Sequence, residues 1–137
     1  MSLEYLLYVS LYKPSPRRAP NEIGRLVNHA REANARNGLS GTLIFTGTRF
    51  AQFLEGPHQN LARVMYKILA DERHNRITVL RRDTSRVRRF DSWSLSYSGP
   101  SLYVDRQLES LVGKGRELHG HNHEREVDQL LRLMVIL

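Results

Sequence analysis

The chain has 137 residues and no cysteine, so one domain with a hydrophobic core is expected, without disulfides, thiolate metal sites or a cysteine nucleophile. No apolar run approaches the roughly 18 residues of a membrane span, and no basic segment precedes an apolar stretch at the N-terminus, so we expect a soluble, cytoplasmic protein without membrane contact. The net charge of +7 permits binding to nucleic acid, phosphate groups or acidic proteins and does not choose among them.

Strand and helix patterns alternate along the first hundred residues. In chain order we predict a strand over 3–10, a helix from Asn21 to about 37, strands over 39–46 and 48–55, a helix from Pro57 to about 72, and strands over 77–84 and 93–97. Asn21 is a favoured helix cap and Gly38 a favoured residue just after a helix. Three prolines between positions 13 and 20 exclude regular structure there.

The order β-α-β-β-α-β-β is typical of the ferredoxin-like arrangement, an α+β fold with one sheet and two helices on one of its faces. The other face needs a cover, which the helical apolar patterns over 102–112 and 124–137 can supply. We therefore divide the chain into a globular domain, residues 1–100, and a C-terminal helical extension, residues 101–137. Residues 113–123 are expected to form a flexible linker.

Three polar side chains are predicted to point into apolar surroundings from three separate elements. Gln52 alternates with Phe50 and Leu54, so these side chains lie on one face of a strand. Asn34 falls in the middle of the apolar stripe of its helix, and Tyr8 lies on an apolar strand face. Burying an amide without partners would cost about 1–3 kcal/mol per unmet group.

Two interpretations of these three polar residues remain open on patterning alone. The side chains can satisfy one another or nearby backbone groups, as polar networks do in ordinary cores. Alternatively, a flat polar ligand lies against them and takes up their hydrogen bonds.

The motifs around these residues resemble one known family. They are LLYVS around Tyr8, Asn34 ahead of GLSG, FAQFLEG around Gln52, DERH from Asp71, and RFDSWSL around Trp93. In this order, over about residues 3–98, the set resembles the BLUF family of blue-light sensors that use FAD. The resemblance implies a photoreceptor that holds FAD noncovalently, with FMN or riboflavin as possible substitutes, between the two helices of a ferredoxin-like fold.

The resemblance also implies roles for individual residues. Tyr8 would be the photochemical electron and proton donor, Gln52 would bridge Tyr8 to the flavin edge at N5 and O4, and Asn34 would hold the O4 and N3–H edge. Positions near the other ring edge and the ribityl chain are matched by Lys67, Asp71, Arg73 and His74. Apolar residues that would sandwich the ring are Ile23, Leu26, Val27 and Ile68.

The light signal would leave the pocket through the strand that carries Trp93 and Leu95, where leucine stands in place of the methionine of many members. Together with Tyr97, these two side chains are expected on one face of the sheet.

No phosphate loop, serine triad or paired-carboxylate motif is evident, so we predict no enzymatic activity. Signalling is expected to reach a separate effector protein or to change a homo-oligomer, since the apolar residues 133–137 do not suit an isolated surface helix.

An alternating set of histidines, His119, His121 and His123, offers imidazoles of the kind that bind zinc or nickel. Their glycine-containing surroundings favour a solvated linker, and we predict no metal site.

Arginines are dense between positions 81 and 89. The cluster comprises Arg81, Arg82, Arg86, Arg88 and Arg89. We expect a solvated turn with ion pairs to Asp83 and Asp91, but the cluster also suits a phosphate-binding patch. The alternative function is therefore a basic ferredoxin-like module that binds RNA or other nucleic acid without flavin, through the aromatic strand around Gln52.

Overall fold

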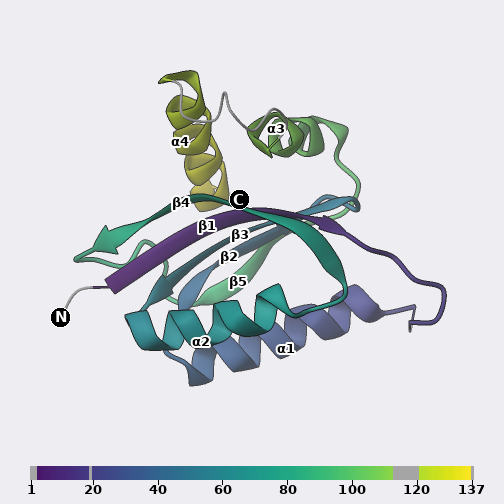
Figure 1. The fold of residues 1–137 in the computed structure, drawn as a ribbon, viewed down its shortest axis with the longest axis horizontal. Coiled ribbons are helices and arrows are strands. Elements are labelled where there is room, and N and C mark those ends of the chain that lie inside the picture. The colour runs from purple at the N-terminus through teal and green to yellow at the C-terminus, as the bar shows by residue number, and fades with distance from the viewer. Residues whose placement is uncertain (1–2, 19, 113–120, 137) are drawn as a thin grey trace.

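The fold is a five-stranded mixed sheet with helices on both faces (Figure 1). The structure, a computed structural model, describes residues 3–18, 20–112 and 121–136. The strands are β1 (Leu3–Tyr12), β2 (Ser40–Phe45), β3 (Arg49–Gly56), β4 (His74–Ser85) and β5 (Trp93–Ser98). The helices are α1 (Glu22–Arg36), α2 (His58–Leu69), α3 (Leu102–Val112) and α4 (His121–Ile136). None of the helices in these ranges is long and apolar enough to cross a membrane.

The strand order across the sheet is β4-β1-β3-β2-β5. β1 pairs antiparallel with β3 and β4, and β3 pairs antiparallel with β2. β1 and β2 therefore run parallel with β3 between them, which is the split β-α-β arrangement of the ferredoxin-like fold. β5 extends the sheet beside β2, in parallel. The predicted α+β class and ferredoxin-like topology are confirmed.

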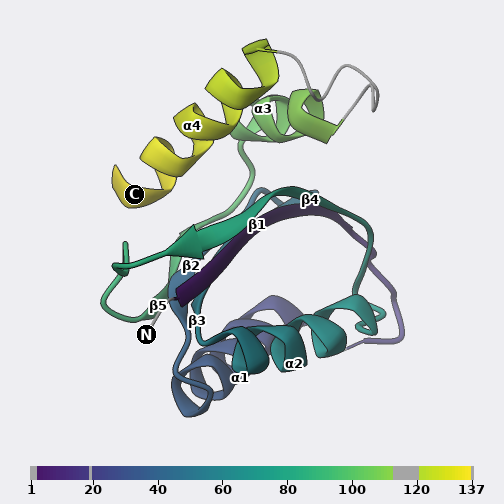
Figure 2. The same ribbon diagram turned by 60° about the vertical axis from the view of Figure 1, so that its left-hand side comes forward.

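The sheet separates two hydrophobic cores (Figure 2). α1 and α2 pack on one face, where Leu6 and Leu54 are fully buried. α3 and α4 lie over the opposite face, which carries Leu7 and Phe53. Because successive side chains along a strand alternate between faces, neighbours such as Leu6 and Leu7 contribute to opposite cores.

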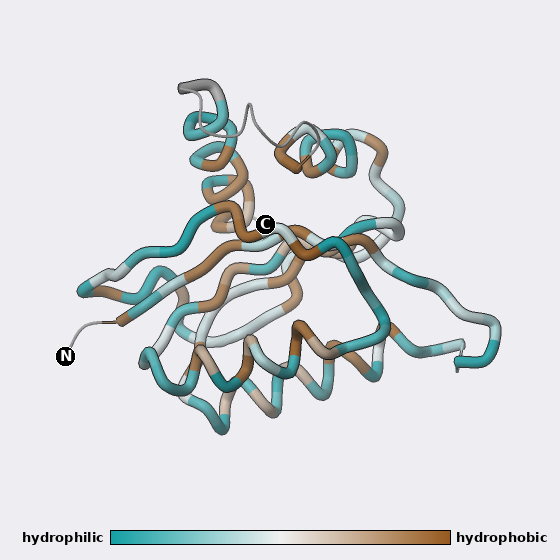
Figure 3. The backbone as a smooth tube through the Cα atoms, viewed as in Figure 1, coloured by the Kyte–Doolittle hydropathy of each residue, from teal (hydrophilic) through white to brown (hydrophobic). Residues whose placement is uncertain are grey.

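The C-terminal helices cover the second face of the sheet, as predicted. Their buried apolar residues are Val104, Leu108, Leu111, Val127, Leu130, Leu131 and Met134, and Figure 3 shows hydrophobic stretches in both helices and in the strands beneath them. Arg81 of β4 also binds the Asp128 carboxylate of α4 at 2.8 Å, and Arg49 of β3 binds Asp105 of α3 at 2.7 Å. With helices on both faces, the described sheet offers no open aromatic surface of the kind on which RNA-binding sheets stack bases.

Several element boundaries differ from the prediction. β4 begins at His74 instead of residue 77, because His74 pairs with Tyr12 of β1, a partner that no local pattern reveals. α2 ends at Leu69, a few residues before the predicted end. α4 begins at His121, so the last part of the predicted linker is helical, and the remainder of that linker, residues 113–120, lies outside the described residues.

Tyr97 lies on the opposite sheet face from Trp93 and Leu95, so the prediction that all three share one face is wrong. Between Leu95 and Tyr97 the pairing with β2 advances by one residue on β2 and by two on β5. This bulge at Ser96 breaks the alternation of side chains. Trp93 and Leu95 therefore join the core under α1 and α2, while Tyr97 packs against the core under α3 and α4.

The arginine-rich segment forms structural contacts, and the predicted ion pairs with Asp83 and Asp91 are not found within the described residues. Arg81 pairs with α4, as described above, and Arg82 pairs with Glu4 of β1 at 2.6 Å. The predicted partners were adjacent in sequence, whereas the actual partners lie on neighbouring elements of the folded chain.

Glu55 anchors the loop between β4 and β5 to the end of the sheet. Its side chain is buried, and its carboxylate accepts hydrogen bonds from the backbone N–H groups of Arg89 and Phe90, both at 2.9 Å, and from the Ser40 hydroxyl at 2.9 Å. Arg88 donates to the same Ser40 oxygen at 2.8 Å. One buried acceptor therefore ties the loop to β2 and β3.

We predict that Glu55→Gln destabilises the fold by about 1–3 kcal/mol, because either orientation of the new amide turns an NH₂ group toward a buried backbone N–H donor. Urea unfolding of the variant and the parent chain measures the difference. Glu32→Gln, at an exposed position of α1, is the matched control and should change the unfolding free energy by less than about 0.5 kcal/mol. Equal unfolding midpoints for Glu55→Gln and the parent would contradict the anchoring role.

Candidate functional site

A cavity of about 240 Å³ lies between α1, α2 and the sheet. It brings together most of the predicted cofactor residues: Tyr8, Leu26, Asn34, Gln52, Lys67, Ile68, Asp71, Arg73 and His74. The volume is slightly below the range of about 300–1,000 Å³ that is common for small-molecule sites. Residues separated by up to 66 positions, Tyr8 and His74, thus share one cavity because β1 is central to the sheet.

Ile23 and Val27, which were predicted to sandwich the flavin ring, do not line this cavity. Val27 is buried in the core beneath α1, and Ile23 borders a separate depression beside the loop that follows β1. A helical wheel gives the direction in which a side chain points but not its height along the helix, which explains the difference.

Other lining residues were not predicted. They are His29, Ala30, Ala33, Arg36, Asn37, Leu43, Phe50 and Val64. Phe50 shares a strand face with Gln52, so alternation along the strand was a sufficient signal for it. Leu43 faces the site because it is the cross-strand partner of Gln52, a register that only the paired sheet defines.

Gln52 occupies the centre of a buried hydrogen-bonded chain. Its Nε2 group donates to the Tyr8 hydroxyl oxygen at 2.6 Å, and its Oε1 atom accepts from the Trp93 indole N–H at 2.8 Å. All three residues are at most 5% exposed. Tyr8 and Gln52 are direct partners in the pairing of β1 with β3, so the sheet register itself brings the hydroxyl and the amide together.

Trp93 fixes the direction of the Gln52 amide. An indole N–H can only donate a hydrogen bond, so the amide atom opposite Trp93 must be the oxygen and the NH₂ group must face Tyr8. The sequence had indicated Trp93 only as part of the route by which the signal leaves. The hydrogen bond itself depends on the parallel pairing of β2 with β5, which places Trp93 on the pocket side.

The Tyr8 hydroxyl is held in its protonated form. Burial raises the pKa of Tyr8 above the usual range, and the negative charge of Asp71 acts in the same direction, against a smaller opposing effect of the Gln52 hydrogen bond. Because Gln52 donates to the hydroxyl oxygen, the hydroxyl proton points elsewhere, and the described residues offer no second partner for it. Tyr8 therefore presents a neutral O–H group at the cavity.

Asn34 carries an unpaired polar group into the cavity. The residue is 3% exposed and lies on the inner side of α1, yet its side-chain amide forms no hydrogen bond with any described residue. A ligand with a donor and an acceptor side by side, as a flavin ring has along its pyrimidine edge, fits this residue.

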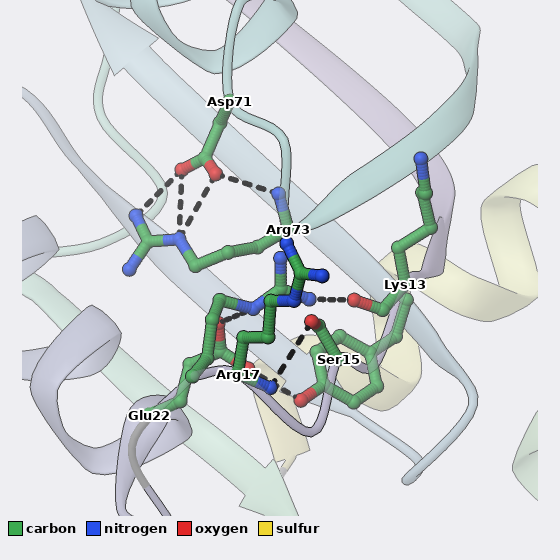
Figure 4. Close-up of polar contacts among 8 residues, drawn as sticks. Lys13, Ser15, Arg17, Glu22, Asp71 and Arg73 are labelled. Carbon is green, nitrogen blue, oxygen red and sulfur yellow. Dashed lines mark hydrogen bonds and ion pairs between the residues drawn. The ribbon is translucent and has the colours of Figure 1, made fainter.

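Asp71 and Arg73 form a multiple ion pair at the mouth of the cavity (Figure 4). The Arg73 guanidinium contacts both carboxylate oxygens at 2.5–3.1 Å, and the Arg73 backbone N–H donates to one of them at 2.9 Å. Although burial acts to raise the pKa of Asp71, the hydrogen bonds from Arg73 outweigh it and hold that pKa below its usual value. Asp71 is therefore an anion paired with Arg73, whereas Lys67, in the last turn of α2, is exposed.

Both ring nitrogens of His74 are engaged. Nε2 lies 2.7 Å from the Ile68 carbonyl oxygen, so it must donate, and Nδ1 lies 2.7 Å from the Ser10 hydroxyl. The ring stands edge-on to Tyr8 at a centroid distance of 6.2 Å. His74 thus closes the side of the cavity between α2 and β1 and holds the Tyr8 ring from the side.

The donor set suits a flat organic ligand better than a metal ion. The described residues contain no group of three His, Asp or Glu side chains placed to bind a metal. Of the alternating histidines, His119 lies outside the described residues, and His123 lies in the first turn of α4, on the far side of the sheet. The cavity instead combines two buried amides, a phenol and apolar walls from Leu26 and Ile68.

Comparison with known proteins points to one family. A family model described as BLUF, sensors of blue light using FAD, matches residues 3–96. The chain is 28% identical over 116 residues to the blue light- and temperature-regulated antirepressor BluF of Escherichia coli K12, covering 84% of this chain and 29% of that protein. It is 35% identical to BlrP1 of Klebsiella pneumoniae, in a structure of its manganese and cyclic-diGMP complex, with a TM-score of 0.61 over 68% of this chain and 24% of that one.

The chain thus spans less than a third of the length of these two relatives. The photo-activated state of BlsA matches along the whole chain and 96% of its own, with a TM-score of 0.75 and 23% identity, which shows a shared fold. The matched model covers well over half of the chain and includes the Tyr8, Asn34 and Gln52 positions. The chain belongs to the BLUF family of blue-light sensors.

Proposed function

We propose that this chain binds FAD noncovalently, with the isoalloxazine ring in the cavity between α1 and α2, and signals blue light by rearranging the hydrogen bonds of Tyr8 and Gln52. The observation that carries the proposal is the buried chain of Tyr8, Gln52 and Trp93 beside that cavity. FMN and riboflavin carry the same ring, so the ring contacts alone admit all three flavins.

Residues from both helices would hold the ring. The unpaired Asn34 amide offers a donor and an acceptor to the ring edge, and Leu26 and Ile68 supply apolar contact from opposite helices. Asp71 and Arg73, at the turn after α2, would meet the opposite ring edge or the ribityl chain. The Gln52 amide has a second N–H, which Tyr8 does not use and which is available to the ring edge.

A bound flavin would supply the absorption of blue light and an oxidising excited state. Tyr8 is the donor in this scheme, because its neutral hydroxyl can release an electron and then a proton, and burial opposes its ionisation in the dark. Once Tyr8 changes its hydrogen bonding, the Gln52 amide is free to turn about its terminal torsion, which has a broad, roughly two-fold profile, or to tautomerise.

Turning of the Gln52 amide breaks the hydrogen bond with Trp93, because two donors would then face each other. The Gln52 oxygen would accept from Tyr8 in the new arrangement. Trp93 begins β5, and β5 leads directly into α3, so a displaced indole has a short covalent route to the C-terminal helices. Leu95, on the same face as Trp93, lies on this route.

The family consists of sensors, and we propose that this chain has no catalytic activity of its own and acts on a separate effector protein through the C-terminal helices or through a homo-oligomer. Val135 and Ile136 at the end of α4 are 59% and 80% exposed, which is consistent with a contact surface. Nucleic-acid binding through β3 is disfavoured, because helices cover both faces of that strand.

Tyr8→Phe is expected to keep flavin affinity within about threefold of the parent chain, because only a hydroxyl is removed. In the proposed mechanism, the rearranged Gln52 amide strengthens a hydrogen bond to the flavin O4 and so moves the absorption slightly and reversibly to the red after blue light. This red shift should be lost in Tyr8→Phe, and absorption spectra in the dark and after illumination measure it. Tyr5→Phe is the control and should photocycle normally, because Tyr5 lies three residues away on the same strand and on the opposite sheet face. A normal photocycle in Tyr8→Phe would refute the donor assignment.

Trp93→Phe is expected to move the dark absorption maximum toward that of the illuminated state and to reduce the light-induced shift, because the donor that fixes the Gln52 amide is gone while the aromatic ring remains. Visible spectroscopy before and after blue light measures both quantities. Tyr97→Phe, on the same strand but the opposite face, is the control. An unchanged dark maximum and shift amplitude would show that Trp93 does not set the amide direction.

Asn34→Ala is expected to weaken flavin binding by about ten- to hundredfold, the effect of losing two hydrogen bonds from a buried site. Quenching of flavin fluorescence on titration measures the dissociation constant. Asn28→Ala removes the same side chain from the exposed side of the same helix and should leave the constant unchanged. Equal affinities of Asn34→Ala and the parent would remove Asn34 from the binding site.

A further inference from the structure

We propose that the cleft between α3 and α4 binds an acidic amphipathic helix of a separate effector protein. This docking site rests on one part of the proposed function, the passage of the signal through the C-terminal helices. The surface of these helices further specifies where the effector would bind and which shape and charge it would present.

The cleft is a cavity of about 670 Å³ between α3 and α4, on the opposite side of the sheet from the cavity between α1 and α2 (Figure 2). The buried side chains of Leu111 and Leu130 line its inner part. Leu102 and Tyr103, at the start of α3, line its outer part and are 67% and 72% exposed. Exposed apolar surface of this kind is typical of contact sites.

The α3 wall of the cleft consists of two rows of side chains, each with a spacing of four residues. The rows are Leu102, Arg106 and Ser110, and Tyr103, Gln107 and Leu111. The groove between two such rows is the shape into which a ridge of side chains on another α-helix packs. Each row extends over about 12 Å, which accommodates about two turns of a docked helix.

Arginines of the sheet neutralise most acidic side chains of α3 and α4. Arg49 of β3 pairs with both acids of α3, and Arg81 of β4 pairs with two acids of α4. The paired acids are Asp105, Glu109, Glu124 and Asp128. The fifth acid in the described part of these helices is Glu126, which lines the cleft and accepts a hydrogen bond from Ser110 at 3.3 Å.

The arginines of the same two helices lack such partners. Arg106 lines the cleft from α3, and Arg125 and Arg132 lie one turn before and one turn after Gln129, which lines it from α4. All three arginines are exposed, and none forms an ion pair with a described residue. A helix with an apolar stripe flanked by Asp or Glu would complement both the apolar groove and these cations.

A second copy of this chain suits the cleft less well than an acidic partner does. The end of α4 exposes the apolar residues Val135 and Ile136, but it also exposes Arg132. Docking this end into the cleft of another copy would add a cation to a surface that already carries Arg106 and Arg125. Like charges across an interface disfavour association, so the charge selects an acidic partner.

Exposed arginines also have a simpler role, because surface charge keeps a protein soluble. That role alone predicts no binding of a helix at the cleft and no preference between acidic and basic partners. A charge preference that depends on Arg106 therefore separates the two explanations.

The test is fluorescence anisotropy with two labelled, stapled helical peptides of about 12 residues, or three turns, titrated with the purified full-length chain in the dark. Both peptides carry leucine at every third or fourth position, and the other positions are Glu and Ala in one peptide and Lys and Ala in the other. At about 50 mM salt we expect the Glu peptide to bind about tenfold more tightly than the Lys peptide. At about 0.5 M salt this preference should shrink, because exposed charges are screened.

Variants of exposed residues locate the binding site. Arg106→Glu should weaken binding of the Glu peptide by about tenfold and strengthen binding of the Lys peptide. Leu102→Ser should weaken both peptides alike, because it removes apolar surface from the cleft without changing its charge. Arg25→Glu reverses an exposed charge on α1, across the sheet from the cleft, and should change neither affinity.

Three results would overturn the proposal: no binding of either peptide, equal affinity of the parent chain for both, or an unchanged preference in Arg106→Glu. Light scattering without peptide tests the second copy, and a dimer that dissociates in Leu102→Ser would also overturn it. All titrations are performed with flavin-free and flavin-loaded chain. Normal peptide binding without any light-induced change in absorption would refute the proposed photochemistry and leave the docking site standing.

Discussion

The Gln52 amide lies between the indole of Trp93, which can only donate, and the hydroxyl of Tyr8, which can donate or accept. Each partner sits on a different strand, and the three strands are held in register by the sheet. Because this hydrogen-bonded chain is buried and the indole can only donate, its described groups satisfy the amide in one orientation. In the proposed mechanism, a change in the state of Tyr8 would alter which atom of the amide is preferred. A switch of this kind needs no large movement, only a second arrangement of similar free energy.

The rest of the fold preserves this buried site by covering the sheet on both faces. α1 and α2 enclose the cavity on one side, and α3 and α4 bury the other side. In the proposed mechanism, a change in the amide would be transmitted through these packed side chains. β5 joins the two layers, since Trp93 packs on one face and Tyr97, beyond the bulge, packs on the other. A short strand therefore contacts both the Gln52 amide and the core beneath the helices that are proposed to pass the signal on.

Charged side chains also help to hold the elements of the fold together. The dense arginines between β4 and β5 hold elements together: Arg81 secures α4, and Arg88 reaches Ser40 beside the buried Glu55. The contacts of Arg81, Arg82 and Arg88 thus serve the fold. Arg36 and Lys67, which form no ion pair with a described residue, border the cavity.

The sequence alone determined the fold class, the covering role of the C-terminal helices, and the inward direction of Tyr8, Asn34 and Gln52, because these depend on local periodicity. Tertiary structure decided the hydrogen bond from Trp93, the opposite face of Tyr97 and the choice of lining residues. The first two depend on the register between strands that are distant in sequence, and the lining depends also on the height of each residue along its helix. A pattern of period two or 3.6 gives the direction of a side chain, whereas its partner is set by pairing and by bulges, which leave no local signal.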